Sequence, residues 1–79
     1  MFDHRQKYIK LRDGSFIFFP ETIEHSQFKN MNIVSAGFCY FRDNMVDCFG
    51  ESFTLKLKSD PEDTKKATIQ IFGYNDPFD

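Results

Sequence analysis

The fold is decided by residues 7–19, which read KYIKLRDGSFIFF. Two runs rich in apolar and aromatic residues flank the dipeptide Asp13-Gly14, and this arrangement is the strongest short-range signal for a β-hairpin. Successive side chains of a strand point to opposite faces of a sheet. Because apolar residues occupy every position from Phe16 to Phe19, both faces of the second strand are expected to be covered. The sequence therefore predicts that this strand is a central one.

A second hairpin is predicted in residues 38–49, which read FCYFRDNMVDCF. A two-residue turn at Asp43-Asn44 sets Cys39 directly across from Cys48. Such a pair is close enough to form a disulfide in an oxidising buffer. Two small buried residues with reduced thiols are the favoured interpretation, because free cysteine is commonly buried and two cysteines do not make a disulfide scaffold.

Further strands are predicted in the middle of the chain. Residues 32–41 form a strand whose small run Ser35-Ala36-Gly37 allows close approach of another backbone or of a ligand, or else forms a bulge. Residues 46–58 form a long strand bent at Gly50, or two short strands. In its second half, apolar and polar residues alternate, and this alternation predicts that the apolar ones face inwards. The inward set is Phe53, Leu55 and Leu57, and the outward set is Ser52, Thr54, Lys56 and Lys58.

A helix is predicted towards the end of the chain. Asp60 is the expected N-cap, Pro61 the first helical residue, and the carboxylates that follow suit the positive end of the helix dipole. An apolar stripe at helical spacing continues to Gly73, which is placed to end the helix. The stripe contains Thr64, Ala67, Thr68, Ile71 and Phe72. Residues 74–79 show no periodic pattern and are expected to form a mobile tail.

These elements predict one α+β domain over residues 1–79, in which an antiparallel sheet of four to five strands carries the C-terminal helix on one face. Residues 21–30 are expected to form a short helix anchored by Ile23 and Phe28, or an irregular crossover. The second face of the sheet would be bare unless this segment or another subunit covered it. A homodimer or higher homo-oligomer is therefore expected.

Composition narrows the class of protein. Hydrophobic residues make up 41% of the chain and charged residues 28%, a balance typical of a folded domain. The formal net charge of −2 argues against a nucleic-acid-binding protein. No apolar run is long enough to span a bilayer, and the first residues do not open a signal peptide, so a cytoplasmic location is expected. Eleven Phe and three Tyr exceed what a small core readily holds, so some are expected at an interface.

Motifs of enzymes are missing from the sequence, which contains no P-loop, no glycine-rich dinucleotide fingerprint and no nucleophile elbow. We therefore predict a protein that is not an enzyme and needs no cofactor. The two histidines, His4 and His25, have no partner residues at the spacing of a metal site. The carboxylates of Asp60, Glu62 and Asp63 are explained as helix-capping groups.

Six residues are candidates for ligand or partner binding. Glu51 and Ser52 adjoin the bend at Gly50, where a polar cluster could contact a ligand, although a solvated turn is the alternative. Two basic groups could meet in a modest positive patch for a phosphate-bearing ligand, or could form the charged outer face of an edge strand. The first group contains Arg5, Lys7, Lys10 and Arg12, and the second contains Lys56, Lys58, Lys65 and Lys66. The six candidates are His25, Ser35, Glu51, Ser52, Lys56 and Lys58.

Three stretches carry a resemblance to a known group of proteins. They are FPETIEHSQF at 19–28, VSAGFC at 34–39 and CFGESFTLKLKSDPED at 48–63, which together cover 32 of the 79 residues. The pattern is similar to that of a group of short proteins, without an assigned activity, encoded by tailed bacteriophages and prophages. The resemblance carries over no catalytic residue. Among the matching positions, folding explains His25, Ser35 and Ser52 least.

The resemblance and the small size imply an accessory protein of a phage or prophage that works by binding. We expect it to bind and inhibit a host factor, such as an antiviral defence protein, in the host cell cytoplasm. The alternative is an oligomeric sponge that sequesters a nucleotide-type signalling molecule of host defence. In that case the nucleotide would lie between Lys56, Lys58 and the bend at Glu51 and Ser52.

Overall fold

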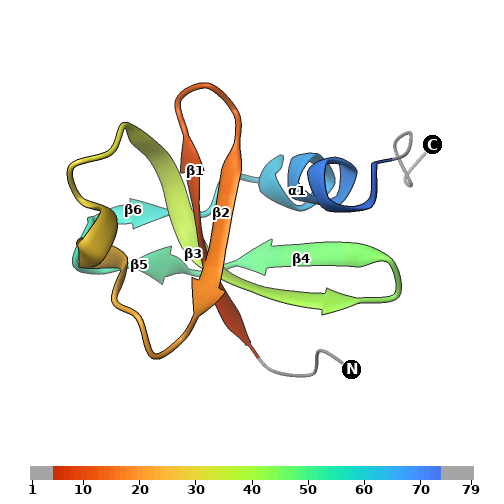
Figure 1. The fold of residues 1–79 in the computed structure, drawn as a ribbon, viewed down its shortest axis with the longest axis horizontal. Coiled ribbons are helices and arrows are strands. Elements are labelled where there is room, and N and C mark those ends of the chain that lie inside the picture. Colours follow the sequence, from red (N-terminus) through yellow and green to blue (C-terminus); the bar gives the residue numbers. More distant parts are fainter. Residues whose placement is uncertain (1–4, 74–79) are drawn as a thin grey trace.

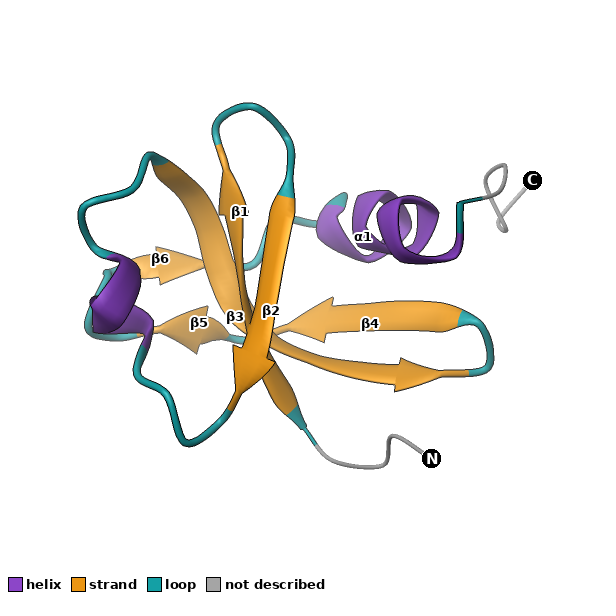
Figure 2. Ribbon diagram, in the orientation of Figure 1, coloured by secondary structure: helices purple, strands orange, loops and turns teal. Residues whose placement is uncertain are grey.

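A strongly twisted antiparallel sheet dominates the computed structural model, which describes residues 5–73 (Figure 1). Four strands pair in the order β2-β1-β3-β4, and two short strands, β5 and β6, pair separately. The elements are β1 (Gln6–Leu11), β2 (Phe16–Pro20), the 3-10 helix η1 (His25–Phe28), β3 (Ile33–Arg42), β4 (Met45–Phe49), β5 (Glu51–Ser52), β6 (Leu57–Lys58) and α1 (Asp63–Phe72). The predicted α+β class, with one C-terminal helix against an antiparallel sheet, is confirmed (Figure 2). The tail predicted at 74–79 lies outside the described residues.

Both predicted hairpins are present, because their turn residues adopt the conformations that tight turns require. Gly14 has a φ of 95° between β1 and β2, where Ile9 pairs with Ile17. Asp43 and Asn44 have φ values of 52° and 58°, as a two-residue hairpin turn demands. This turn fixes the register of β3 and β4 and sets Cys39 opposite Cys48, as predicted.

The prediction that residues 16–19 form a central strand is wrong, because β2 is at one edge of the sheet and β1 is inside it. Both faces of β2 are nevertheless covered. Phe16 packs in the cluster of Tyr8, whereas Phe19 packs with Ile9 in the cluster on the opposite face. A run of apolar residues therefore indicates that both faces of a strand are buried, not that the strand is central. In a small, tightly curled sheet, an edge strand can also be buried on both faces.

The interpretation of the first basic group as the outer face of an edge strand is also wrong. It fails because β1 lies between β2 and β3. Lys7 and Lys10 are each only 8% exposed. Two cations of the chain are thus inside the domain, where each needs a partner.

Helix α1 bonds to both outer strands of the four-stranded sheet. Thr64 and Thr68 accept hydrogen bonds from backbone N–H groups of β4, each at 2.9 Å. On β2, the backbone N–H of Phe16 donates to Gln70 Oε1 at 2.8 Å, and Gln70 Nε2 donates to the Phe16 carbonyl at 3.2 Å. The sheet curls so far that one helix reaches both edges. Side chains of α1 therefore occupy backbone groups that an edge strand would otherwise present to another chain.

The helix begins two residues later than predicted. Asp60 is not the N-cap, and Pro61 precedes the helix, which starts at Asp63 after Glu62. Asp60 Oδ1 accepts a hydrogen bond from the Glu62 N–H at 2.8 Å, so it closes a turn ahead of the helix. The helix ends as predicted at Gly73, whose φ is 67°.

The alternation predicted for residues 52–58 holds from Thr54 to Lys58, where Leu55 and Leu57 pack inwards, but a tight hairpin between β5 and β6 reverses it at Ser52 and Phe53. Phe53 is 82% exposed and Ser52 only 2%, the reverse of the prediction. Ser52 Oγ accepts a hydrogen bond from the Leu55 N–H at 3.3 Å, and such local bonds compete with regular strand pairing. Lys56 completes the turn with a φ of 57°.

The second face of the sheet is covered by the chain itself. Leu55 and Leu57 of the hairpin and Phe28 of η1 pack against buried Ile9 and Ala36. In Figure 1 these covering elements lie at the opposite end of the molecule from α1. The bare face from which an oligomer was inferred is therefore filled, and the homo-oligomer stays a prediction.

The small run in β3 serves a close approach between backbones. A β-carbon at Gly37 would collide with the Phe49 carbonyl oxygen, at the point where β4 leads into β5. The pairing of β1 with β3 also shifts by one residue, so that Lys10 faces Ser35 whereas Leu11 faces Ile33. Of the two alternatives predicted for the run Ser35-Ala36-Gly37, the close approach of a backbone is present, and the irregularity in pairing lies just before the run, at Val34.

Candidate functional site

Three of the six predicted binding residues, His25, Glu51 and Ser52, line one small cavity beneath the β5–β6 hairpin. The cavity has a volume of about 170 Å³. We call it the hairpin cavity. Its buried or half-buried wall consists of Lys7, His25, Phe38 and Ser52, and its exposed rim consists of Glu24, Glu51, Phe53 and Thr54.

His25 is held in place by the backbone and by two aromatic rings. It is 4% exposed, and its Nε2–H donates to the Gly37 carbonyl at 2.9 Å. Its ring meets those of Phe19 and Phe38 edge to face. Burial lowers the pKa of His25 below its ordinary value, and the bond to Gly37 offsets this only in part. The side chain is therefore a packed neutral imidazole whose Nε2 is already used.

Lys7, a member of the first basic group, also lines this cavity, and its burial there was not predicted from the sequence. Its Nζ donates to the Ile23 carbonyl at 2.9 Å. Within residues 5–73, no carboxylate lies within 4 Å of this ammonium group. Strand alternation cannot identify such a residue, because the segment from 21 to 28 that buries Lys7 lies over β1 only in the folded chain.

Ser35 lies elsewhere, in a buried polar network under α1. Asp63, which is 0% exposed, is the centre of this network. Its Oδ2 accepts hydrogen bonds from the Tyr8 hydroxyl at 2.6 Å, the Ser35 hydroxyl at 2.8 Å and the Asp60 N–H at 2.9 Å. Lys10 Nζ lies 2.8 Å from Asp63 Oδ1. We call these four side chains the Asp63 network: Tyr8, Lys10, Ser35 and Asp63.

The pKa values of Asp63 and Tyr8 follow from the burial and the hydrogen bonds of the Asp63 network. Burial alone would raise the pKa of Asp63, but the donors from Lys10, Tyr8, the Asp60 backbone and Ser35 together lower it. Burial and the bond to Asp63 raise the pKa of Tyr8 well above its usual range. The carboxylate is ionised, with three hydrogen bonds to Oδ2 and the Lys10 ammonium against Oδ1, so the network stabilises the fold. The bond to Asp63 explains the burial of Ser35. The buried role of Asp63 was not predicted, because its position two residues after Pro61 is typical of a helix-capping group.

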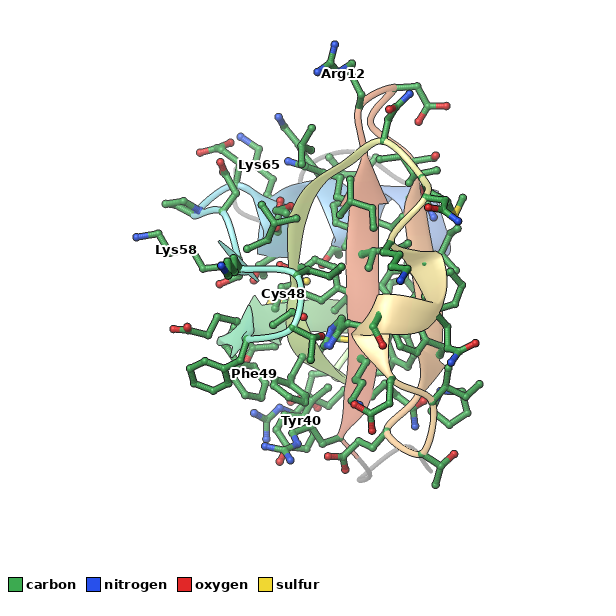
Figure 3. All side chains as sticks on the ribbon, turned by 90° about the vertical axis from the view of Figure 1, so that its left-hand side faces the viewer. Arg12, Tyr40, Cys48, Phe49, Lys58 and Lys65 are labelled. Atoms are coloured by element: carbon green, nitrogen blue, oxygen red, sulfur yellow. The ribbon has the colours of Figure 1, made fainter. Side chains whose placement is uncertain are left out.

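Lys56 and Lys58 project from the hairpin and do not line the hairpin cavity. Figure 3 shows Lys58 directed away from the ribbon into solvent. Lys58 and Glu51 are opposite each other in the register of β5 and β6. The two strands therefore carry opposite charges at neighbouring positions. The two lysines therefore add charge to the surface around the hairpin.

Cys39 is buried, as predicted, whereas Cys48 is half-buried. Both are free, and both pack in the cluster beneath α1. Burial raises the pKa of Cys39 to about 12 and raises that of Cys48 still further. The thiolate is the reactive form of cysteine. Both thiols are protonated at neutral pH and are therefore poor nucleophiles.

An aromatic and cationic surface adjoins the hairpin cavity through Phe38. The Arg5 guanidinium lies 4.3 Å from the centre of the Phe38 ring, and that of Arg42 lies 4.9 Å from the Tyr40 ring. Tyr40 and Phe49 stack at 5.6 Å, and Figure 3 shows them side by side below Cys48. Aromatic residues and arginine are the side chains most enriched in protein interfaces.

A larger groove of about 450 Å³ lies between the β1–β2 turn and residues 30–32. It contains none of the six predicted residues. Its acidic group, Asp13, accepts two hydrogen bonds from Ser15, and Arg12 is exposed. This groove offers no buried polar group to a ligand.

Comparison with protein-family models, with curated proteins and with solved structures gives no match. Within residues 5–73, no group of three or more His, Cys, Asp or Glu side chains is arranged to hold a metal ion. No helix in that part of the chain has the length and apolar character needed to cross a membrane. The geometry of the hairpin cavity is therefore the basis for a functional assignment.

Proposed function

We propose that the protein is a small, non-enzymatic binding protein that acts by contacting a protein partner through the β5–β6 hairpin. The observation that carries this proposal is Phe53, which is 82% exposed at the turn of the hairpin. Leaving a phenylalanine in water forgoes about 1.5–3 kcal/mol of burial energy. A partner that covered this ring would recover that energy.

Binding rather than catalysis is supported by the state of the reactive groups. The carboxylate of Asp63, the Nε2 of His25 and both thiols are buried and engaged or protonated at neutral pH. A general base or nucleophile needs access to its substrate and a matched pKa. The groups that are open to solvent around the hairpin are instead those of a contact surface.

The resemblance to short phage proteins gives the partner its expected identity. We propose a host factor, such as an antiviral defence protein, that is blocked by this contact in the host cytoplasm. The sponge for a nucleotide signal has less support, because the hairpin cavity is smaller than the roughly 300–1,000 Å³ of small-molecule sites. A nucleotide would need a site built between subunits.

The test is affinity capture from a bacterial host lysate with the tagged wild-type chain, Phe53→Ala and Ile71→Ala. Ile71 is 44% exposed on α1, away from the hairpin, and so serves as the matched control. We expect the wild type and Ile71→Ala to retain one stoichiometric protein, and Phe53→Ala to bind it about 30-fold more weakly, the loss typical of a hot-spot residue. Equal retention by Phe53→Ala, or no stoichiometric protein at all, would contradict the proposal.

A further inference from the structure

Lys7 is a buried cation whose pairing is incomplete. It is 8% exposed, and the single hydrogen bond of its ammonium within residues 5–73 goes to the Ile23 carbonyl. A lysine ammonium carries three donors, and burying a charge without a counter-ion is costly. The side chain lines the hairpin cavity. An anion that entered this cavity would provide the counter-ion that residues 5–73 do not.

Two hydroxyl groups stand in the same cavity. Ser52 is 2% exposed, and its Oγ lies 3.3 Å from Thr54 Oγ1. The bond between the two hydroxyls uses one of their two protons, so the other proton remains available to a ligand. A bound anion would therefore receive hydrogen bonds from Lys7 and from one hydroxyl.

The size and rim of the cavity select the kind of anion. A volume of about 170 Å³ is suited to a single side chain. The exposed rim carries two carboxylates, those of Glu24 and Glu51. They repel a phosphate, which carries a charge of about −1.5 to −2 at neutral pH, more strongly than a singly charged carboxylate. The ring of Phe38 in the wall and that of Phe53 on the rim provide apolar surface for an aliphatic stem.

We propose that the hairpin cavity is a carboxylate-binding site, and that an aspartate or glutamate side chain of the protein partner enters it and pairs with Lys7. This inference rests on the proposed function, since it specifies the chemistry of the partner that covers Phe53. The partner then presents an acidic side chain beside an apolar patch, so that the carboxylate reaches Lys7 while the patch covers the phenylalanine.

The test is an NMR titration of the full-length protein at pH 7 and constant ionic strength with N-acetyl-glutamate N-methylamide. Matched probes are the glutamine and lysine analogues and inorganic phosphate. We expect saturable amide shifts at Lys7, His25 and Ser52 with the glutamate probe and none with the glutamine probe. Tighter binding of the lysine probe or of phosphate, or shifts that do not saturate, would overturn the inference.

Two variants locate the effect. Lys7→Met keeps the aliphatic stem and should weaken binding of the glutamate probe about tenfold, whereas Lys66→Met on the exposed face of α1, away from the cavity, should leave it unchanged. Glu51→Gln removes one repelling charge from the exposed rim and should strengthen binding, which keeps the inference testable if Lys7→Met folds poorly. Equal weakening by Lys7→Met and Lys66→Met would overturn it. These probes do not involve the partner, so failure here is distinguishable from failure of the capture experiment.

Discussion

Lys10 and Lys7 are both 8% exposed and lie three residues apart on β1, yet they face different sides of the sheet and meet different surroundings. Lys10 points to the α1 side, where it pairs with Asp63 at 2.8 Å. Lys7 points to the hairpin side, where its ammonium meets one backbone carbonyl. The same residue type at the same depth thus has a carboxylate counter-ion on one side of the sheet and, within residues 5–73, none on the other.

The difference separates the structural side of the molecule from the side available for binding. A buried polar network whose members are all satisfied makes a fold specific and rigid. A buried charge with an open position is instead stabilised by whatever supplies its counter-ion. The side chains of α1 also occupy backbone groups of β2 and β4, so that end of the molecule leaves little for another chain to pair with.

The comparison predicts its largest effect for Asp63→Ala, which leaves Lys10 buried without a counter-ion. We expect a loss of about 3–5 kcal/mol in the free energy of unfolding, measured by urea denaturation. Such a loss is a large share of the roughly 5–15 kcal/mol that keeps a domain folded. The neighbouring exposed residue gives the control, Glu62→Ala. A loss below about 1 kcal/mol for Asp63→Ala would contradict the structural role of the network.

A smaller effect is expected for Thr68→Val, which keeps the shape of the side chain but removes the acceptor for the Val46 N–H. Leaving a buried backbone donor unpaired costs about 1–3 kcal/mol. Urea denaturation measures this loss. Lys66→Ala on the exposed face of the same helix should change the stability by less than about 0.5 kcal/mol. Equal stability of Thr68→Val and wild type would show that α1 does not need to bond to β4.

The sequence predicts those parts of the fold that are decided locally. Asp43 and Asn44 tolerate positive φ values, and Gly14 favours one, so both hairpins and their registers follow from a few neighbouring residues. Gly73 ends α1 for the same reason. The start of α1 and the burial of Asp63 and Lys7 depend instead on tertiary contacts. Asp63 turns inwards to meet Tyr8, which lies 55 positions away along the chain, and no local rule for helix caps contains that information.

In the candidate site, too, some residues could be predicted from local sequence and others depend on tertiary contacts. Glu51 and Ser52 meet in the hairpin cavity because they follow the predicted bend at Gly50, whereas His25 reaches it from η1. Phe53 was missed since its alternation with Leu55 and Leu57 is typical of an inward-facing residue. Lys7 was missed because a basic residue in a strand is usually exposed, and its burial depends on the crossover that follows β2.

The pH dependence of stability should distinguish the two sides. Burial lowers the pKa of His25, so as the pH falls below its ordinary value of 6.5 the unfolded chain binds more protons than the folded one. The free energy of unfolding should therefore decrease from about pH 6.5 down to the lowered pKa, with a further decrease below about pH 3.8 as Asp63 is protonated. Urea denaturation across this range provides the measurement. In His25→Gln the first decrease should be missing and the second retained; loss of both, or persistence of the first, would contradict the assignment.

The smallest effect is expected for Lys7→Met, and its smallness is informative. Replacing an incompletely paired buried charge by an apolar side chain of similar shape is often neutral or stabilising, whereas Lys10→Met leaves the Asp63 carboxylate without its cation. We expect Lys7→Met to lie within about 1 kcal/mol of the wild type in urea denaturation and Lys10→Met to be clearly less stable. If both were equally destabilised, Lys7 would be as important to the fold as Lys10. If they differ as expected, β1 carries one lysine that stabilises the domain and one whose ammonium is open to a ligand.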